Sequence, residues 1–375
     1  MGMRLGTRRL VALAAVGVLG ALSLTACGSD TSDDGGDGGS SDSAKKVGVI
    51  LPDATTSPRW EANDRPSLQQ AFDDAGIEST ITNADGDVAK FGSICDSMIN
   101  EGVQVLMIVN LDSESGSACL KKAKDAGIQS IDYDRLTLGG GASYYVSFDN
   151  VKVGDLMGEG LTKCLDDAGK TKANIVFING DPNDNNAALF KSGYQQNLQP
   201  KFDSGDYKLV GDQTGEWDAT KAGTAFEQIF TQNNGKVDGV VSANDTMAGG
   251  IIARLKANGL DGKVPVTGQD ASVEGLQRIL AGTQCMTVYK DTNLEAKAAS
   301  DLAIALINGD KEKAASLASG TVKDTELNVD VPSALATPEI IYTDGVAKVI
   351  SDGFQSADDV CTGQYAKLCQ ENGVQ

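Results

Sequence analysis

The amino-acid sequence predicts an α/β protein with two similar lobes, each built on a parallel β-sheet that helices cover on both faces. Short, continuous apolar segments alternate with amphipathic segments, as expected for strands that are buried between helices. This alternation starts a second time at Val151. The chain of 375 residues also exceeds the roughly 250–300 residues that one hydrophobic core usually serves.

The first series begins at Lys46 and alternates strands with helices. We expect strands at Val47–Leu51, Ser79–Thr82, Val103–Val109 and Ser130–Asp132. We expect helices at Glu61–Ala75, Ala89–Asn100 and Ser115–Ala126, of which the first and the third are followed by a glycine. Aliphatic and β-branched residues fill the strand segments, which favours an extended backbone buried on both faces.

The second series has the same composition. Its helices are expected at Val151–Ala168, Ala187–Asn197, Thr220–Asn233 and Thr246–Ala257, and its strands at Ala173–Ile178, Lys208–Asp212, Val237–Ala243 and Val264–Gly268. A further strand, Gly282–Lys290, and a helix, Asn293–Ile307, follow. The remainder, including Asp330–Pro332 and Pro338–Tyr342, is expected to be short and strand-like and to cross back between the lobes.

An internal repeat supports two lobes rather than one long sheet. Val103–Asp134 and Val237–Asp270 each run from a strand through an asparagine to a helix, a stop that contains glycine, a second strand and a final aspartate. Similarity over this length is typical of two related structural units.

Residues 1–27 have the composition of an export signal. Three arginines precede an apolar run, Leu10–Leu22, that is too short to span a membrane comfortably. The segment ends in Leu24-Thr25-Ala26-Cys27, which resembles the lipobox of bacterial lipoproteins and implies that Cys27 is lipidated and becomes the first residue. The alternative is an ordinary cleavage site that carries a cysteine.

Residues 28–45 are rich in glycine, serine and aspartate, a composition that cannot bury a core and predicts a flexible acidic tether. Together the two segments predict an extracytoplasmic protein that a lipid at Cys27 anchors to the cell membrane.

The overall composition argues against several functions. A net charge of −20 disfavours a nucleic-acid partner, because such partners require a basic surface. The chain contains no histidine, which removes Ser-His-Asp and Cys-His nucleophiles and the commonest zinc ligand. Because a CxxC motif is absent from the sequence as well, we expect neither a metal nor a cofactor.

Six cysteines follow Cys27, and an even number in an exported protein indicates disulfides, although six cysteines allow fifteen pairings. Cys361 and Cys369 are close in the sequence, and Cys95 and Cys119 lie on successive expected helices. Cys164 and Cys285 remain as the third pair.

The candidate binding site begins where a predicted strand ends in Asp134-Arg135. Ligands bind at the carboxyl ends of strands in open parallel sheets, and a carboxylate beside a guanidinium suits a ligand made of hydroxyls. A solvated surface ion pair is the alternative. Other polar or aromatic side chains at or just after predicted strand ends are Arg59, Trp60, Asn110, Asp184, Asn185, Asn186, Trp217, Asn244, Asp245, Gln269, Asp270 and Lys290.

This set predicts a neutral polyhydroxylated ligand, such as a monosaccharide. Carboxylates and amides can bridge neighbouring hydroxyls, and an indole can cover the apolar face of a sugar ring. Each member has an alternative role. Asn244-Asp245 is also a typical helix N-cap, Asp184–Asn186 a turn and cap, Trp217 a core residue, and Arg59 and Lys290 are also consistent with solvated side chains.

From Lys46 to about Gly353 the chain resembles the type I periplasmic sugar-binding proteins of ABC importers, and within them it is closest to the D-xylose-binding branch. The motifs that carry the resemblance are Pro58–Trp60, Ile131–Arg135, Ser147–Gly154, Asp184–Asn186, Ser242–Asp245, Gly268–Asp270 and Gly282–Lys290. The cysteines and the loop Asp53–Ser57 depart from the family's pattern.

The resemblance implies two Rossmann-like lobes, residues 46–148 plus 291–336 and residues 149–290 plus 337–375, with a sugar bound between them. It implies three crossing segments, near Phe148–Asn150, Lys290-Asp291 and Leu335–Pro338. The implied ligand contacts are Arg59, Trp60, Asp134, Arg135, Asn186, Trp217, Asn244, Asp270 and Lys290, with Asn185 as the neighbour of Asn186 that takes its place if the register differs by one.

The implied function is capture of a monosaccharide, D-xylose or a related aldose, by a monomer that closes on it and delivers it to an ABC permease. A sensory receptor that signals to a membrane kinase is the alternative. A sugar-responsive repressor shares this fold, but the export signal and the lack of DNA-binding helices before Lys46 argue against it. A glycosidase would need paired carboxylates such as Asp134 and Asp270, whereas arginine and asparagine partners suit holding a sugar, so we do not expect an enzyme.

Overall fold

The computed structural model describes residues 45–374. The predicted signal segment 1–27, the lipidation site Cys27 and all of the predicted tether except Lys45 lie outside the described residues. Among the residues that are described, no helix combines the length and the apolar character needed to cross a membrane.

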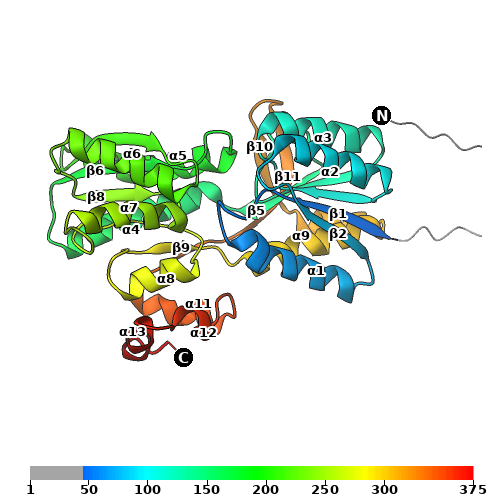
Figure 1. Ribbon diagram of the computed structural model, residues 1–375. Coiled ribbons are helices and arrows are strands. Elements are labelled where there is room, and N and C mark those ends of the chain that lie inside the picture. Colours follow the sequence, from blue (N-terminus) through cyan, green and yellow to red (C-terminus); the bar gives the residue numbers. More distant parts are fainter. Residues whose placement is uncertain (1–44, 375) are drawn as a thin grey trace, which may run out of the picture. The chain divides into compact units, whose positions relative to one another are not determined.

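The first sheet in residues 45–374 has seven strands. Their spatial order is β10 (Gly320–Asp324), β11 (Val329–Ala336), β5 (Tyr144–Phe148), β4 (Gln129–Tyr133), β3 (Val105–Ile108), β1 (Lys46–Leu51) and β2 (Glu78–Asn83). All neighbours pair in parallel except β10 and β11. Figure 1 shows β11, which comes from near the end of the chain, beside β5.

Helices cover both faces of this sheet, as the continuous apolar strands predict. Val47, Val49 and Leu51 of β1 pack in one cluster with the side chains of α1 (Arg65–Asp74) and α9 (Thr292–Ile307). Ile50 points to the other face, where it packs with residues of α2 (Val88–Asn100) and α3 (Ser113–Asp125). The short helix α10 (Lys311–Leu317) follows α9 and leads to β10.

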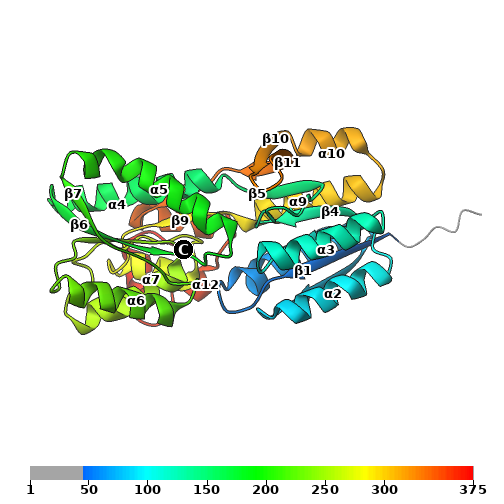
Figure 2. The same cartoon turned by 90° about the horizontal axis from the view of Figure 1, so that it is seen from above.

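The second sheet consists of β7 (Tyr207–Thr214), β6 (Ala173–Asn179) and β8 (Gly239–Ser242), all parallel. Helices α4 (Asn150–Asp167) and α5 (Asn185–Asp203) pack against each other on one face, and α6 (Ala219–Gln232) and α7 (Asp245–Ala257) on the other (Figure 2). One large apolar cluster joins the sheet to these helices.

The predicted strand Val264–Gly268 does not form as a continuous strand. The structure has a single parallel bridge here, between Val266 and Val240. Pro265 lies within the segment and has no N–H to donate, so it limits the pairing to isolated hydrogen bonds. The predicted strand Gly282–Lys290 is reduced to β9 (Thr287–Tyr289), which pairs antiparallel with β12 (Glu339–Ile341).

The predicted helix Glu61–Ala75 is divided in two. Trp60–Asp64 is a π-helix, η1, and α1 begins at Arg65 with Pro66 in its first turn, where the missing N–H costs no hydrogen bond. Single turns of π-helix occur often at functional sites, and η1 contains two of the residues discussed below.

Within residues 45–374 the chain leaves or rejoins the elements of the first sheet at three places. These are Phe148–Asn150, between β5 and α4; Lys290-Asp291, between β9 and α9; and the residues between Ala336 and Glu339, from β11 to β12. The backbone N–H of Asp149 donates to the carbonyl oxygen of Ala336 at 3.1 Å, so two of the three crossings are joined by a hydrogen bond.

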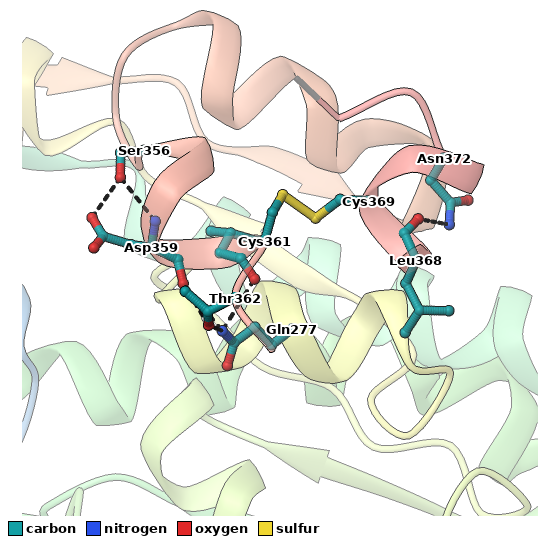
Figure 3. The surroundings of a disulfide bond; sticks show 9 residues. Gln277, Ser356, Asp359, Cys361, Thr362, Leu368, Cys369 and Asn372 are labelled. Atoms are coloured by element: carbon teal, nitrogen blue, oxygen red, sulfur yellow. Dashed lines mark hydrogen bonds between the residues drawn. A yellow bond between two sulfur atoms is a disulfide. The ribbon is translucent and has the colours of Figure 1, made fainter. Parts of the chain in front are cut away.

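The expectation that the C-terminal remainder is strand-like is wrong beyond Ile341. Helices α11 (Val346–Ser351), α12 (Ala357–Val360) and α13 (Tyr365–Glu371) pack together with α8 (Val273–Leu280), a helix that the sequence analysis missed. Gln277 of α8 donates from its amide nitrogen to the carbonyl oxygens of Asp359 and Val360 at 3.2 and 3.1 Å (Figure 3). β5 and α10 were missed as well.

The six described cysteines lie in the three pairs considered from the sequence. The Cα atoms are 5.9 Å apart for Cys95 and Cys119, 6.4 Å for Cys164 and Cys285, and 5.7 Å for Cys361 and Cys369. All three separations lie in the range that a disulfide spans. Figure 3 shows the third pair, which links the segment after α12 to α13.

Candidate functional site

A pocket lined by polar and aromatic side chains lies where elements of the first sheet meet those that follow it in the chain. Residues before and after the strands of the first sheet contribute Thr56, Ser57, Arg59, Trp60, Asp134 and Arg135. Residues that follow the strands of the second sheet or lie on its helices are Asp184, Asn186, Phe190, Trp217 and Asn244, and residues at or next to β9 are Gln269, Asp270 and Lys290. The structure therefore brings together every residue of the sequence-based set of ligand contacts except Asn185.

Asn185 and Asn186 are the first two residues of α5, and of the two, Asn186 lines the pocket. Asp184 caps this helix by accepting a hydrogen bond from the Asn186 N–H at 2.9 Å. Successive residues on a helix point about 100° apart, so the side chains of Asn185 and Asn186 take different directions. Asn185 is partly exposed and does not line the pocket, so Asn186 is the member of the pair that we propose as a ligand contact.

Three pocket residues have a left-handed backbone: φ is +62° at Asp134, +59° at Trp217 and +98° at Asp270. Such conformations are unfavourable for residues other than glycine and persist where the surrounding structure imposes them. The Asp134 N–H donates to the Val146 carbonyl at 2.8 Å, and the Asp270 N–H donates to the Val288 carbonyl at 2.9 Å. The neighbouring strands thus hold these two aspartates at the ends of extended segments.

Lys290 lies between the two aspartates. Its Nζ is 3.7 Å from Oδ2 of Asp134 and 3.6 Å from Oδ1 of Asp270. Asp270 Oδ2 also accepts a hydrogen bond from the Ser57 hydroxyl at 3.3 Å. Lys290, which directly follows β9, therefore bridges a carboxylate from each side of the pocket.

Arg135 has partners on both sides as well. Its Nη1 donates to the Asn110 carbonyl at 3.1 Å, and its Nε lies 3.0 Å from Oδ2 of Asp184. Burial raises the pKa of Asp184, and the positive charge of Arg135 opposes this effect. Each cationic side chain in the pocket faces carboxylates, so the pocket offers no unbalanced charge to an ionic ligand.

Arg59 makes four hydrogen bonds to carboxylates. Nε and Nη2 donate to Asp64 at 2.9 and 2.6 Å, Nη1 donates to Asp134 at 2.7 Å, and Nη2 also donates to Glu295 at 2.6 Å. A guanidinium has five N–H groups, so one remains for a ligand. The resemblance implied that Arg59 contacts the ligand, and in the structure most of its donors bind the protein.

Asp134 is ionised in this environment. Burial alone would raise its pKa, but the positive charges of Arg59, Lys290 and Arg135 outweigh burial and lower the pKa to about 2. Its Oδ1 accepts a hydrogen bond from the Asn186 amide at 3.1 Å. A permanently charged acceptor is suited to binding hydroxyl donors.

Asn244 serves as a cap and as a pocket residue at once. Its side-chain oxygen accepts from the Met247 N–H at 2.8 Å and so caps α7, as the alternative reading of the sequence predicted. Its amide nitrogen lies 3.5 Å from the carbonyl oxygen of Thr56, on the opposite side of the pocket. The cap therefore fixes the side-chain rotamer that presents the amide to the pocket.

The two indoles of the protein both line the pocket. Trp60 and Trp217 also belong to hydrophobic clusters, so the core role considered for Trp217 holds beside its place in the pocket. Neither indole N–H has a hydrogen-bond partner among residues 45–374. Phe190 contacts the edge of Trp217, with the ring centroids 6.2 Å apart.

Some site residues were not singled out from the sequence. Thr56 and Ser57 precede the Pro58–Trp60 motif directly, and Phe190 follows Asn186 by four residues, which places it on the same face of α5. That spacing was the available signal for Phe190. Glu295 carries no local signal, because it lies 236 positions from Arg59 in the sequence. Asp64 lies only five residues after Arg59, but the π-helix that brings the two side chains together was not predicted.

Comparison with known proteins gives a consistent family. A model described as the periplasmic binding protein domain matches residues 47–311. The D-xylose-binding periplasmic protein of Escherichia coli (strain K12) is 38% identical over 320 residues, covering 84% of this chain and 92% of that protein. The multiple sugar-binding periplasmic receptor ChvE of Rhizobium radiobacter is 33% identical over 330 residues, with 84% and 92% coverage.

Solved structures agree with this result. The carbohydrate transporter solute binding protein of Chloroflexus aurantiacus, in complex with D-glucose, has a TM-score of 0.76 and 29% identity, covering 84% of this chain and 98% of that one. An ABC transporter solute binding protein of Clostridium phytofermentans with bound β-D-glucose has a TM-score of 0.75 and 28% sequence identity, and the match covers 84% of this chain and 100% of that one. With a matching family model over most of the chain and relatives of this similarity, the protein belongs to the periplasmic binding proteins and has their type I fold.

Proposed function

We propose that this protein is an extracytoplasmic solute-binding lipoprotein that captures a monosaccharide, D-xylose before other aldoses, and delivers it to an ABC permease. The observation that carries the proposal is the pocket in which buried carboxylates, amides and two indoles converge from both sides. Relatives whose names specify D-xylose or several sugars support the choice of ligand.

The chemistry of the pocket favours a neutral sugar. The carboxylates of Asp134 and Asp270 accept hydrogen bonds from hydroxyls, and the amides of Asn186 and Asn244 bind hydroxyls as donors or acceptors. Arg135 and Lys290 donate to hydroxyl or ring oxygens. Trp60 and Trp217 cover the apolar faces of the ring. The balance of charges disfavours a sugar phosphate or a sugar acid, because an added anion would face Asp134, Asp184 and Asp270 without a free cation.

Capture involves closure of two lobes, residues 46–148 plus 291–336 and residues 149–290 plus 337–375, about the three crossing segments. In the described structure the pocket side chains are buried, and polar contacts such as that of Ser57 with Asp270 join the two sides. A ligand that bridges the two sides binds this closed form better than an open one and shifts the equilibrium toward closure. The permease then recognises the closed form.

A panel of sugars tests the proposal directly. We expect D-xylose to raise the melting temperature of the purified protein by several degrees, and isothermal titration calorimetry to give 1:1 binding with a micromolar or lower Kd. D-glucose, D-galactose, L-arabinose and D-ribose form the comparison set, and xylose 5-phosphate tests the exclusion of anions. Absence of binding by all of the neutral sugars would contradict the proposal.

The membrane anchor and the disulfides belong to the same proposal. Mass spectrometry of protein from an expressing bacterium should show an N-terminal peptide that begins at a lipid-modified Cys27. Peptide mapping without reduction should recover Cys95 with Cys119, Cys164 with Cys285 and Cys361 with Cys369. An unmodified N-terminus that begins after a different residue would remove the anchor from the proposal.

Two competing roles are distinguished by function. A relative named as a receptor makes sensing the second candidate. Deletion of the gene separates the two roles. Loss of sugar uptake supports transport, whereas loss of a sugar-dependent transcriptional response supports sensing. We propose that the protein is a monomer without catalytic activity. Incubation with xylosides, followed by chromatography, should leave the sugars unchanged.

A further inference from the structure

A buried group of charges lies behind the pocket, and the proposed function does not account for it. It consists of Arg59, Asp64, Tyr133, Asp134 and Glu295, and we call it the Arg59 cluster. Of its members, Arg59 and Asp134 line the pocket, whereas Asp64, Tyr133 and Glu295 do not. Asp64 and Glu295 are fully buried, and a carboxylate is rarely buried unless a specific partner compensates it.

The geometry of the cluster fixes the guanidinium of Arg59. Asp64 accepts from Nε and Nη2 with its two oxygens, which is the bidentate arrangement that sets the plane of a guanidinium. The phenol of Tyr133 donates to Oδ1 of Asp64 at 2.5 Å and so fixes that carboxylate in turn. The π-helix makes this possible, because it places Asp64 five residues after Arg59 on the same face.

Glu295 holds the same guanidinium from another element. Its Oε2 accepts from Nη2 of Arg59 at 2.6 Å, and its Oε1 has no hydrogen-bond partner among residues 45–374. The hydrogen bond from Arg59 is therefore the polar contact that holds the Glu295 side chain in place. Glu295 lies in the first turn of α9, directly after the crossing segment that begins at Lys290.

The segment from Lys290 to Glu295 thus acts on Asp134 twice. Lys290 approaches the Asp134 carboxylate directly at 3.7 Å, and Glu295 acts on it through Arg59, which donates to the same oxygen, Oδ2. Both contacts come from one crossing between the proposed lobes.

We propose that Asp64 and Glu295 are positioning residues for sugar binding: they fix Arg59, and Arg59 fixes the Asp134 carboxylate in the orientation that receives the ligand. This inference rests on the proposed function. In this role Arg59 acts mainly through Asp134, and α9 connects the crossing at Lys290-Asp291 to the binding site.

A positioning role predicts that sugar affinity changes when Glu295 gains or loses its proton. A purely structural role predicts no such change. Burial raises the pKa of Glu295 to about 8, Arg59 and Lys290 oppose this, and Asp134 and Asp64 add to it. The charged and titratable groups that face Glu295 are Arg59, Asp64, Tyr133, Asp134, Tyr145 and Lys290. At pH 7 the side chain is therefore mostly neutral, and its ionisation at higher pH makes it compete with Asp134 for Arg59.

Variants of Glu295 test the proposal by calorimetric titration with D-xylose. Glu295→Gln resembles the neutral carboxyl group and should retain affinity within about threefold at pH 7, whereas Glu295→Ala removes a charge-assisted contact to Arg59 and should lose about tenfold or more. Asp301→Asn is the matched control, because Asp301 lies on the same helix and pairs with Lys297 at the surface. This control should bind as the wild type does.

The pH profile completes the test. Wild-type affinity should fall between pH 7 and 9.5, and Glu295→Gln should bind equally at both values. Asp64→Asn should lose more affinity than Glu295→Ala, because Asp64 accepts two of the Arg59 hydrogen bonds. Circular dichroism verifies that each variant is folded, and if Glu295→Ala or Asp64→Asn does not fold, the pH profile of Glu295→Gln decides.

Wild-type affinity in Glu295→Ala, or a pH profile of Glu295→Gln that matches the wild type, would overturn the positioning role. Failure of the proposed function is distinguished from this outcome, because it would appear as absence of sugar binding by the wild-type protein itself.

Discussion

Asn186, in the first turn of α5, donates both to the main-chain oxygen and to the side-chain Oδ1 of Asp134, at 3.0 and 3.1 Å. The oxygen of the same amide accepts from Asn150 at 2.8 Å, on the helix that follows the first crossing. A single asparagine thus connects the left-handed aspartate at the end of β4 to the elements of the second sheet. Loss of the Asn186 amide should therefore affect both sides of the pocket.

Replacement of Asn186 by alanine should weaken sugar binding by about 10- to 100-fold. The change removes a hydrogen bond to the Asp134 carboxylate, which contributes about 1.5–3 kcal/mol, and a second one to the Asp134 main-chain oxygen. Asn185→Ala is the matched control, because Asn185 is the neighbouring residue and does not line the pocket. Calorimetric titration measures both, and equal losses in the two variants would contradict the assignment of Asn186.

Replacement of Asp270 or Arg135 by alanine should reduce sugar affinity by about a hundredfold or more while the protein remains folded. Loss of Asp270 removes one of the carboxylates that face the buried Lys290, and loss of Arg135 removes the guanidinium that faces the buried Asp184. A buried charge that loses its partner is strongly unfavourable. Calorimetry measures affinity, and circular dichroism verifies the fold. Unaltered affinity in both folded variants would remove these residues from the site.

Gly180→Ala should displace Trp217 and weaken binding. A Cβ atom at Gly180 would lie 2.0 Å from the Trp217 ring, so the indole must move or the backbone must shift, which costs about 1–3 kcal/mol. Gly92→Ala provides the control, because a Cβ atom there meets nothing within 4 Å. Tryptophan fluorescence with a xylose titration should separate the two variants, and an unchanged emission maximum in Gly180→Ala would contradict the packing argument.

Asp132 should make the apoprotein less stable as the pH rises from about 4 to 7. Burial raises the pKa of this carboxyl to about 7, while hydrogen bonds from Thr137 oppose the shift and Asp324 adds to it. The folded state keeps a proton that the unfolded state has released, so stability falls with pH by at most about 1.4 kcal/mol per unit in this window. Above the folded pKa the dependence ends.

Asp132→Asn removes this titration, and urea unfolding between pH 4 and 8 should show a smaller slope than in the wild type. The exposed variant Asp301→Asn should leave the slope unchanged. If the slope for Asp132→Asn equals that of the wild type, the raised pKa of Asp132 is contradicted.

Loss of the Cys164–Cys285 link should destabilise the protein more than loss of the Cys361–Cys369 link. Chain entropy predicts about 5 kcal/mol for a sequence separation of 121 and about 2.6 kcal/mol for a separation of 8. Urea unfolding of the two double-serine variants measures the difference. The opposite order would indicate that packing around the cysteines, rather than loop closure, dominates.

The sequence by itself determined the fold class and the composition of the pocket. Continuous apolar strands such as Val47–Leu51 require cover on both faces, and their carboxyl ends must meet at one edge of a sheet. The resemblance to two-lobed sugar-binding proteins then implied that polar residues after strands of the two lobes, such as Asp134 and Asp270, face one another although 136 positions separate them. The position of Phe190, one turn after Asn186, was also available from helical spacing.

Only the tertiary structure decided which of these side chains face the pocket and which hold another side chain. Asn185 and Asn186 are equivalent by composition, and the start of α5 at its Asp184 cap orients one of them inward. Arg59 looked like a ligand donor from its motif, yet Asp64 and Glu295 bind most of its N–H groups. The helices after Ile341 depend on packing against α8. In each case the deciding contact joins residues that are distant in sequence or depends on helix phase, and local sequence patterns carry neither kind of information.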